Sequence, residues 1–389
     1  MRRLFIVPAL LLSALLVSSA PAETTHIFPP QEKHVHSSSI VECPNGDMLA
    51  VWFYGSGERK SNDVRLRGAR LKKGSTDWSP VFEMADTPDL PDCNPVLFID
   101  ADEKLWLFWL VVHTNRWERG ILKYRTSTDY MGEGAPDWDW QDIILLKPGE
   151  DFADKLKAGF KELAYPEYMW SEYALAYTDM LVESATDPIK TDMGWMGRTP
   201  VLTLQSGRIL LPLYSDGFNV SLMAYSDDKG ATWQASDPIV GLGNIQPAVV
   251  ERKDGTLKAY MRDNGVMPKR IIEATSTDQG ITWTVGTDME FPNPGASVSA
   301  CALADGRWVL VYNDAEQGRH NLAILLSEDE GKTWPYKKML ESSEDASESF
   351  GYPTVMRGTD GNIHLTYSYK GPEGASINYS TFTAASIKN

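Results

Sequence analysis

One pattern of apolar and polar positions recurs six times along the chain. Each copy is a mostly apolar run, a polar turn and a second apolar run, as in SSIVECPNGDMLAVWF at residues 38–53. Most of the turns contain Asn-Gly, Asp-Gly or Ser-Gly, which are typical of β-hairpins. The units begin near Ser38, Asn94, Thr199, Gln246, Ala296 and Tyr352. We therefore expect an all-β chain of six similar sheets, with a further pair of strands after each of the first five units.

A second motif, Ser-x-Asp-x-Gly-x-Thr-Trp, occurs at residues 226–233, 276–283 and 327–334. The copies are about 50 residues apart, and a fixed period of this size is typical of propellers and arrays. Glycine supplies a positive φ for a tight turn, the Asp and Ser oxygens accept turn amides, and Trp covers the apolar face behind the turn. Degraded copies lie at 74–78 and 127–138. We interpret the motif as a structural staple between strands, without a catalytic role.

This motif resembles the Asp-box of the sialidase (neuraminidase) superfamily. The resemblance implies a six-bladed β-propeller built from BNR repeats, in which residues 23–389 form a single sialidase-like domain. The sixth unit ends near Phe382, one strand short of the others. A ring closes most simply if the segment around residues 25–28 pairs with that unit, because the pairing removes an open sheet edge.

The segment from about 151 to 195 lacks the hairpin pattern and separates the second unit from the third. Residues 152–163 have helical spacing with an acidic start, so the segment is predicted to be a helical insertion. It is either a flap over one mouth of the ring or a peripheral decoration. Its aromatic residues favour contact with sugar, since sugar faces stack on rings: Tyr165, Tyr168, Trp170, Tyr173 and Trp195.

The N-terminus has the order of a secretory signal peptide. Two arginines are followed by an apolar run from Leu4 to Val17 and by small residues up to Ala22. The run is too short and wrongly flanked for an anchor, so cleavage after residue 22 is expected. No second long apolar run follows. The sequence therefore predicts a secreted or periplasmic protein without a membrane span.

Charge and cysteine content narrow the possible partners. The formal net charge is −16, which argues against nucleic acid or an anionic membrane as a partner. The three cysteines, Cys43, Cys93 and Cys301, have no CxxC or Cys/His spacing, and at most one disulfide can form. No cluster with calcium-loop spacing occurs. We expect no metal and no cofactor, and a glycan or oligosaccharide as the partner.

Candidate site residues occupy matching places in successive units, since the inner strands of a propeller converge on one mouth. Sialidases bind a sugar carboxylate with three arginines, use a tyrosine nucleophile and protonate the leaving group with an aspartic acid. By resemblance, Arg262 and Arg319 correspond to the second and third arginines, and Tyr352 to the nucleophile. Asp63 corresponds to the acid/base and Arg59 to a sugar contact in the first unit.

The chain departs from the sialidase pattern at three places. His36 occupies the position of the first arginine, and Gln246 that of the glutamate that activates the tyrosine. The partner of the first arginine is also lost, because residues 366–368 read Thr-Tyr-Ser. Gln246 is no general base, and an unassisted tyrosine has a pKa near 10. We expect Gln246, Asn94 and Asn313 to line the mouth and to donate hydrogen bonds to sugar hydroxyls.

These observations predict a secreted, sialidase-like exo-glycoside hydrolase that removes a terminal, acidic sugar from glycans. The departures leave two alternatives open. One is a carbohydrate-binding propeller without catalysis, and the other is a polysaccharide lyase acting on uronates. In the structural alternative for the candidate residues, the arginines are salt-bridge residues between blades and Tyr352 is a buried strand residue.

Overall fold

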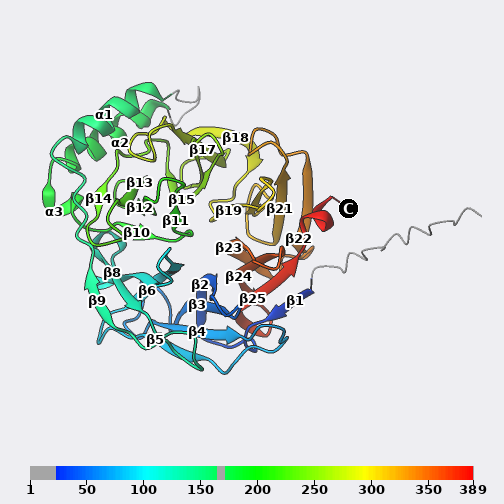
Figure 1. Ribbon diagram of the computed structural model, residues 1–389. Helices are drawn as coiled ribbons and strands as arrows, with labels where there is room; N and C mark the ends of the chain where they lie inside the picture. Colours follow the sequence, from blue (N-terminus) through cyan, green and yellow to red (C-terminus); the bar gives the residue numbers. More distant parts are fainter. Residues whose placement is uncertain (1–22, 164–170, 389) are drawn as a thin grey trace, which may run out of the picture.

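The computed structural model describes residues 23–163 and 171–388. Six antiparallel sheets stand around a common axis and form a closed ring (Figure 1). The predicted six-bladed β-propeller is thereby confirmed. The expected signal peptide, residues 1–22, lies outside the described residues.

The blades follow one another along the chain, and the first strand of each blade lies nearest the axis. Blade one is β2 (His34–Glu42), β3 (Met48–Gly55), β4 (Arg65–Leu71) and β5 (Phe82–Ala85), and blade two is β6 (Asp92–Ile99), β7 (Leu105–Val112), β8 (Gly120–Ser127) and β9 (Trp140–Ile143). Blade three is β10 (Met196–Gly197), β11 (Leu202–Thr203), β12 (Ile209–Ser215), β13 (Val220–Ser226) and β14 (Gln234–Ala235). Blade four is β15 (Asn244–Glu251), β16 (Leu257–Asp263), β17 (Arg270–Ser276) and β18 (Thr287–Pro292). Blade five is β19 (Ser299–Ala302), β20 (Trp308–Tyr312), β21 (Asn321–Ser327) and β22 (Tyr336–Ser342).

Blade six closes the ring with both ends of the described chain. Its strands are β23 (Ser349–Arg357), β24 (Ile363–Gly371), β25 (Gly374–Phe382) and, as the outermost strand, β1 (Glu23–His26). β1 runs antiparallel to β25, and just beyond it Ile27 N–H donates to the Ile377 carbonyl at 2.8 Å. The predicted closure by the N-terminal segment is confirmed, and it covers an edge that would otherwise offer free backbone groups.

The inner strands of blades one, two, four and six share a local irregularity. Each contains a register shift, and each shift includes one non-glycine residue with a φ of 51–58°. These residues are Ser37, Asn94, Gln246 and Tyr352. A β-bulge bends the strand and redirects a side chain, and a positive φ is uncommon for such residues. The bulges therefore set the direction of equivalent side chains around the axis.

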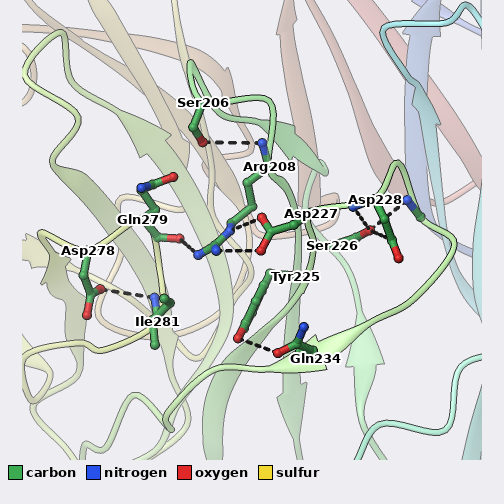
Figure 2. A network of polar contacts seen from close by, with 11 residues as sticks. Ser206, Arg208, Tyr225, Ser226, Asp227, Asp228, Gln234, Asp278, Gln279 and Ile281 are labelled. Atoms are coloured by element: carbon green, nitrogen blue, oxygen red, sulfur yellow. Dashed lines mark hydrogen bonds and ion pairs between the residues drawn. The ribbon is translucent and has the colours of Figure 1, made fainter.

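The Asp-boxes staple each blade to its neighbour. In the first box, Ser226 Oγ accepts from Gly230 N–H at 2.8 Å, and the Asp228 carboxylate accepts from Thr232 N–H at 2.8 Å. The other two boxes repeat these bonds. Figure 2 shows the first box beside an ion pair from Arg208 to Asp227, and Arg208 also donates to a carbonyl of the next box at 3.2 Å. The predicted structural role of the motif agrees with these contacts.

The insertion between blades two and three is helical, as predicted, with α1 (Phe152–Glu162), α2 (Ser171–Ser184) and α3 (Pro188–Thr191). It lies against blades two and three at the outside of the ring (Figure 1). Phe152 is fully buried, and its ring packs edge-on against Trp195 and Phe218.

The expectation of sugar contact is wrong for Trp195. This side chain is 2% exposed, and its Nε1 donates to the Thr191 carbonyl at 2.7 Å, so it is part of the core beneath the insertion. Tyr165, Tyr168 and Trp170 lie outside the described residues, as does the side chain of Tyr173.

Candidate active site

Tyr352 lies at the centre of the candidate site, on the bulge of β23. Its hydroxyl oxygen accepts a hydrogen bond from Arg262 Nη1 at 3.1 Å and one from Gln246 Nε2 at 3.4 Å. The three side chains come from blades six and four, and they meet because the inner strands converge on the axis. The arrangement brings together residues that are about 90 and 106 positions apart in the sequence.

Arg319 also faces Tyr352. The guanidinium carbon of Arg319 is 5.2 Å from the centre of the Tyr352 ring, and Arg319 Nη2 donates to the Gly295 carbonyl at 3.0 Å. Arg262 is steadied from its other side by Asn264, whose Oδ1 accepts from Nη2 at 3.2 Å. Two arginines predicted to bind a carboxylate therefore lie beside one tyrosine.

A third arginine, which sequence reasoning missed, also lies close to the Tyr352 ring. Arg198 falls between β10 and β11, and its guanidinium carbon is 5.1 Å from the centre of the Tyr352 ring. It is 1% exposed and donates to the Pro353 carbonyl at 2.7 Å. The available signal was its position directly before Thr199-Pro200, the opening of the third unit.

His36 occupies the place predicted for it, beside the tyrosine. The centres of the His36 and Tyr352 rings are 4.0 Å apart. Burial lowers the pKa of His36 well below its ordinary value, and the positive charge of Arg319 lowers it further. His36 is therefore neutral at pH 7 and adds no positive charge where sialidases have an arginine.

The predicted amide residues have different partners. Asn94 Nδ2 and Gln246 Nε2 each donate to the hydroxyl of Tyr214 at 3.1 Å, and all three side chains are buried. Asn313 Nδ2 donates to two backbone carbonyls, one of them that of Phe350 at 2.8 Å. These bonds use both of its amide hydrogens. Asn313 thus holds the backbone at Asn321 and Phe350, which differs from its predicted role of donating to sugar hydroxyls.

Asp63 lies in the loop after β3, and its contacts are local. Its carboxylate accepts from Ser56 N–H at 2.8 Å and Ser56 Oγ at 2.6 Å, and it pairs with Lys33 Nζ at 3.0 Å. The Ser56 hydroxyl, above all, holds the pKa of Asp63 well below its ordinary value. Within the described residues, no hydrogen bond or ion pair joins Asp63 to Tyr352 or to the arginines around it.

The neighbouring Glu58 has the opposite environment. Burial raises the pKa of Glu58, and the positive charges of Arg59, Arg319 and Arg262 lower it by less. Arg59 is engaged, because its Nη2 lies 2.8 Å from the Asp216 carboxylate and its guanidinium lies 5.2 Å from the Trp117 ring. Sequence reasoning noted Glu58 in this loop but gave roles only to Arg59 and Asp63.

Two cavities adjoin the Arg59–Asp216 ion pair. A cavity of about 480 Å³ is lined by residues 114–118 together with this pair, and a second of about 790 Å³ shares Glu118 and Asp216 with it. The second cavity continues to Asp187 and Lys190 beside α3. The two cavities therefore adjoin each other at Glu118 and Asp216.

The described residues contain no cluster of His, Cys, Asp or Glu suited to a metal ion. Over the same residues, no helix is long and apolar enough to cross a membrane. The three cysteines are free thiols.

The chain belongs to the family described as the BNR repeat-like domain, whose model matches residues 46–149 and 179–365. It is 31% identical to a sialidase from Micromonospora viridifaciens over 175 residues, which are 42% of this chain and 25% of the relative. It thus spans about a quarter of that relative's length. The predicted relation to sialidases is confirmed.

Solved structures share the fold across nearly the whole chain. A leech intramolecular trans-sialidase, solved with 2,7-anhydro-Neu5Ac, superimposes with a TM-score of 0.69 at 15% identity, covering 95% of this chain and 71% of that one. A Dyadobacter fermentans protein of unknown function superimposes with a TM-score of 0.67 at 18% identity, covering 93% and 98%. At these identities the superpositions establish the propeller fold.

Proposed function

We propose that this protein is an exo-acting glycoside hydrolase of the sialidase type, which removes a terminal sugar that carries a carboxylate. The observation that carries the proposal is the position of the Tyr352 hydroxyl, 3.1 Å from Arg262 and on a ring that also faces Arg319. The relation to sialidases supports the same chemistry. Arginines bind a carboxylate through charge-assisted hydrogen bonds, so they would orient the anomeric carbon toward the tyrosine.

In the first step Tyr352 Oη, as the phenolate, attacks the anomeric carbon, and the bond from that carbon to the leaving oxygen breaks. A carboxylic acid gives its proton to the leaving oxygen at the same time. A tyrosine suits a carbon that bears a carboxylate, because an Asp or Glu nucleophile would be repelled by that charge. The product of this step is a glycosyl-tyrosine and a free alcohol.

Two carboxyl groups of the loop after β3 are candidates for the acid. Asp63 was predicted from the resemblance, but the Ser56 hydroxyl and Lys33 favour its ionised form. Glu58 is half-buried, burial raises its pKa, and it interacts electrostatically with Arg262 and Arg319. A general acid must hold its proton near working pH, so Glu58 is the better candidate.

In the second step the Glu58 carboxylate takes a proton from a water molecule, and the water oxygen attacks the anomeric carbon. The bond from that carbon to Tyr352 breaks, which releases the sugar and restores both side chains. Two displacements at one carbon return the original configuration, so the proposal predicts a retaining enzyme.

The test measures turnover of α-sialosides and uronosides that carry either a sugar or an aryl leaving group. We expect Tyr352→Phe to abolish hydrolysis whichever leaving group is present. Glu58→Gln should slow glycosides with a sugar leaving group by about 10²–10⁴-fold and slow aryl glycosides much less, since a phenol leaves without a proton. Asp63→Asn is the matched comparison from the same loop and should stay within a few fold of wild type.

Other outcomes would overturn parts of the proposal. If Asp63→Asn shows the leaving-group dependence and Glu58→Gln does not, the acid is Asp63. If wild type binds acidic glycans but releases no sugar, the protein is a binding propeller. If it forms an unsaturated, ultraviolet-absorbing product from uronate polymers, it is a lyase, and the hydrolytic steps above are wrong.

We also propose that the protein is exported, on the basis of the basic, apolar and small residues that open the chain. Mass spectrometry of protein recovered from an expressing host should find an N-terminus near Glu23 and most of the protein outside the cytoplasm. Intact Met1 on cytoplasmic protein would refute export.

A further inference from the structure

Arg198 is a buried charge without a carboxylate partner. Its acceptors are neutral: the Pro353 carbonyl at 2.7 Å, Thr354 Oγ1 at 3.2 Å and the Ser38 carbonyl at 3.5 Å. Its Nε is buried and has no hydrogen-bond partner. None of the ion pairs among the described residues includes Arg198. A buried charge of this kind is costly unless an anion lies nearby.

The Tyr352 hydroxyl lacks a clear proton acceptor, and the centre of its ring lies 5.1 Å from the guanidinium carbon of Arg198. Its oxygen contacts Arg262 Nη1 and Gln246 Nε2, and both of these atoms are donors. Reversing the Gln246 amide would turn its oxygen toward Tyr352, whereas the arginines have no acceptor atom in any orientation. The hydroxyl hydrogen of a neutral Tyr352 therefore has no hydrogen-bond acceptor among the arginines.

The charged and titratable groups that act on Tyr352 come from blades one, three, four and five: His36, Glu58, Arg198, Tyr214, Arg262 and Arg319. Burial raises the pKa of Tyr352, but Arg262 and Arg319 outweigh it and leave the pKa below the ordinary value. Burial raises the pKa of Tyr214, the other phenol in the cluster. Tyr352 is therefore the phenol best placed to balance the arginines.

We propose that Arg198 is a positioning residue that, together with Arg262 and Arg319, keeps Tyr352 as a phenolate in the free protein. This inference rests on the proposed function, and it deepens it, because it explains how the tyrosine is activated where the expected glutamate is Gln246. An amide at this position donates to the phenolate. A carboxylate there would place a second negative charge beside it.

The test needs no substrate. Ultraviolet difference spectra of wild type against Tyr352→Phe, titrated with pH, should show one phenolate that is already formed at pH 7, with a midpoint well below the value of about 10 for an ordinary tyrosine. Arg198→Met should raise the midpoint by about one pH unit or more, because it removes a buried positive charge. Arg198→Lys keeps the charge and should restore most of the shift.

Gln246→Glu gives a second, independent measurement if Arg198→Met does not fold. The added carboxylate should raise the phenolate midpoint and lower kcat at pH 7, whereas a glutamate that activates the tyrosine would raise kcat. Absence of a phenolate in wild type, or an unchanged midpoint in folded Arg198→Met, would overturn the inference. A phenolate without turnover would leave it standing and would refute the proposed hydrolase instead.

Discussion

Replacing Gly331 by alanine should destabilise the propeller more than the same change at Gly255. Both glycines have a positive φ, 76° and 84°. A Cβ on Gly331 would lie 2.4 Å from the Tyr260 hydroxyl and 2.7 Å from the Trp308 ring, whereas a Cβ on Gly255 would meet nothing within 4 Å. Gly255→Ala thus measures backbone strain alone, and Gly331→Ala adds steric overlap.

The size of the difference follows from the surroundings of Gly331. Tyr260 and Trp308 are 0% and 1% exposed, so neither ring can move aside without disturbing the contact between blades four and five. Strain from the positive φ costs about 1–2 kcal/mol in both variants. Overpacking adds about 1–3 kcal/mol for Gly331→Ala only.

Thermal unfolding of wild type and both variants at one scan rate measures this difference. The entropy of unfolding is about 0.8 kcal/mol/K for a chain of this length, so the added overlap should lower Tm by about 1–4 °C relative to Gly255→Ala. Equal Tm values for the two variants would refute the idea that the Asp-box glycine is required by the close approach of the preceding blade. Gly331→Ala should not change the phenolate signal, because its box lies away from Tyr352.

Three further predictions concern ring closure, the insertion and pH. Ile27→Pro should lower Tm more than Ile27→Ala, because only proline also removes the hydrogen bond to Ile377; equal losses would mean that this bond adds nothing. Phe152→Ala should lower the free energy of unfolding by about 3–5 kcal/mol and should direct limited proteolysis to residues 150–195. A cleavage pattern like that of wild type would contradict the packing described for Trp195. Burial raises the pKa of Glu58, and only its acid form donates the proton, so kcat/KM should fall as pH rises through that pKa. Glu58→Gln should lose this fall in kcat/KM at high pH. If Glu58→Gln keeps it, the fall belongs to another group.

The sequence by itself determined the architecture. Period-two apolar runs, Gly-containing turns and the three Asp-boxes are local signals, and each specifies a hairpin or a staple without help from distant residues. Counting the units gave six blades, and the missing strand of the last unit gave the closure by residues 25–28. Matching places within the units also pointed to Arg262, Arg319 and Tyr352, which the structure brings together.

Only the tertiary structure decided how these residues are used. Arg198 lies in a part of blade three where the inner strand is broken, and its place directly before Thr199-Pro200 does not show that its guanidinium packs near the Tyr352 ring. Glu58 and Asp63 are both carboxylic acids of the same loop and cannot be told apart by sequence. In the structure Glu58 is partly buried near arginines, whereas Asp63 is bound by Ser56 and Lys33. Burial and charge depend on which blades meet at the axis, and that proximity arises when the ring closes.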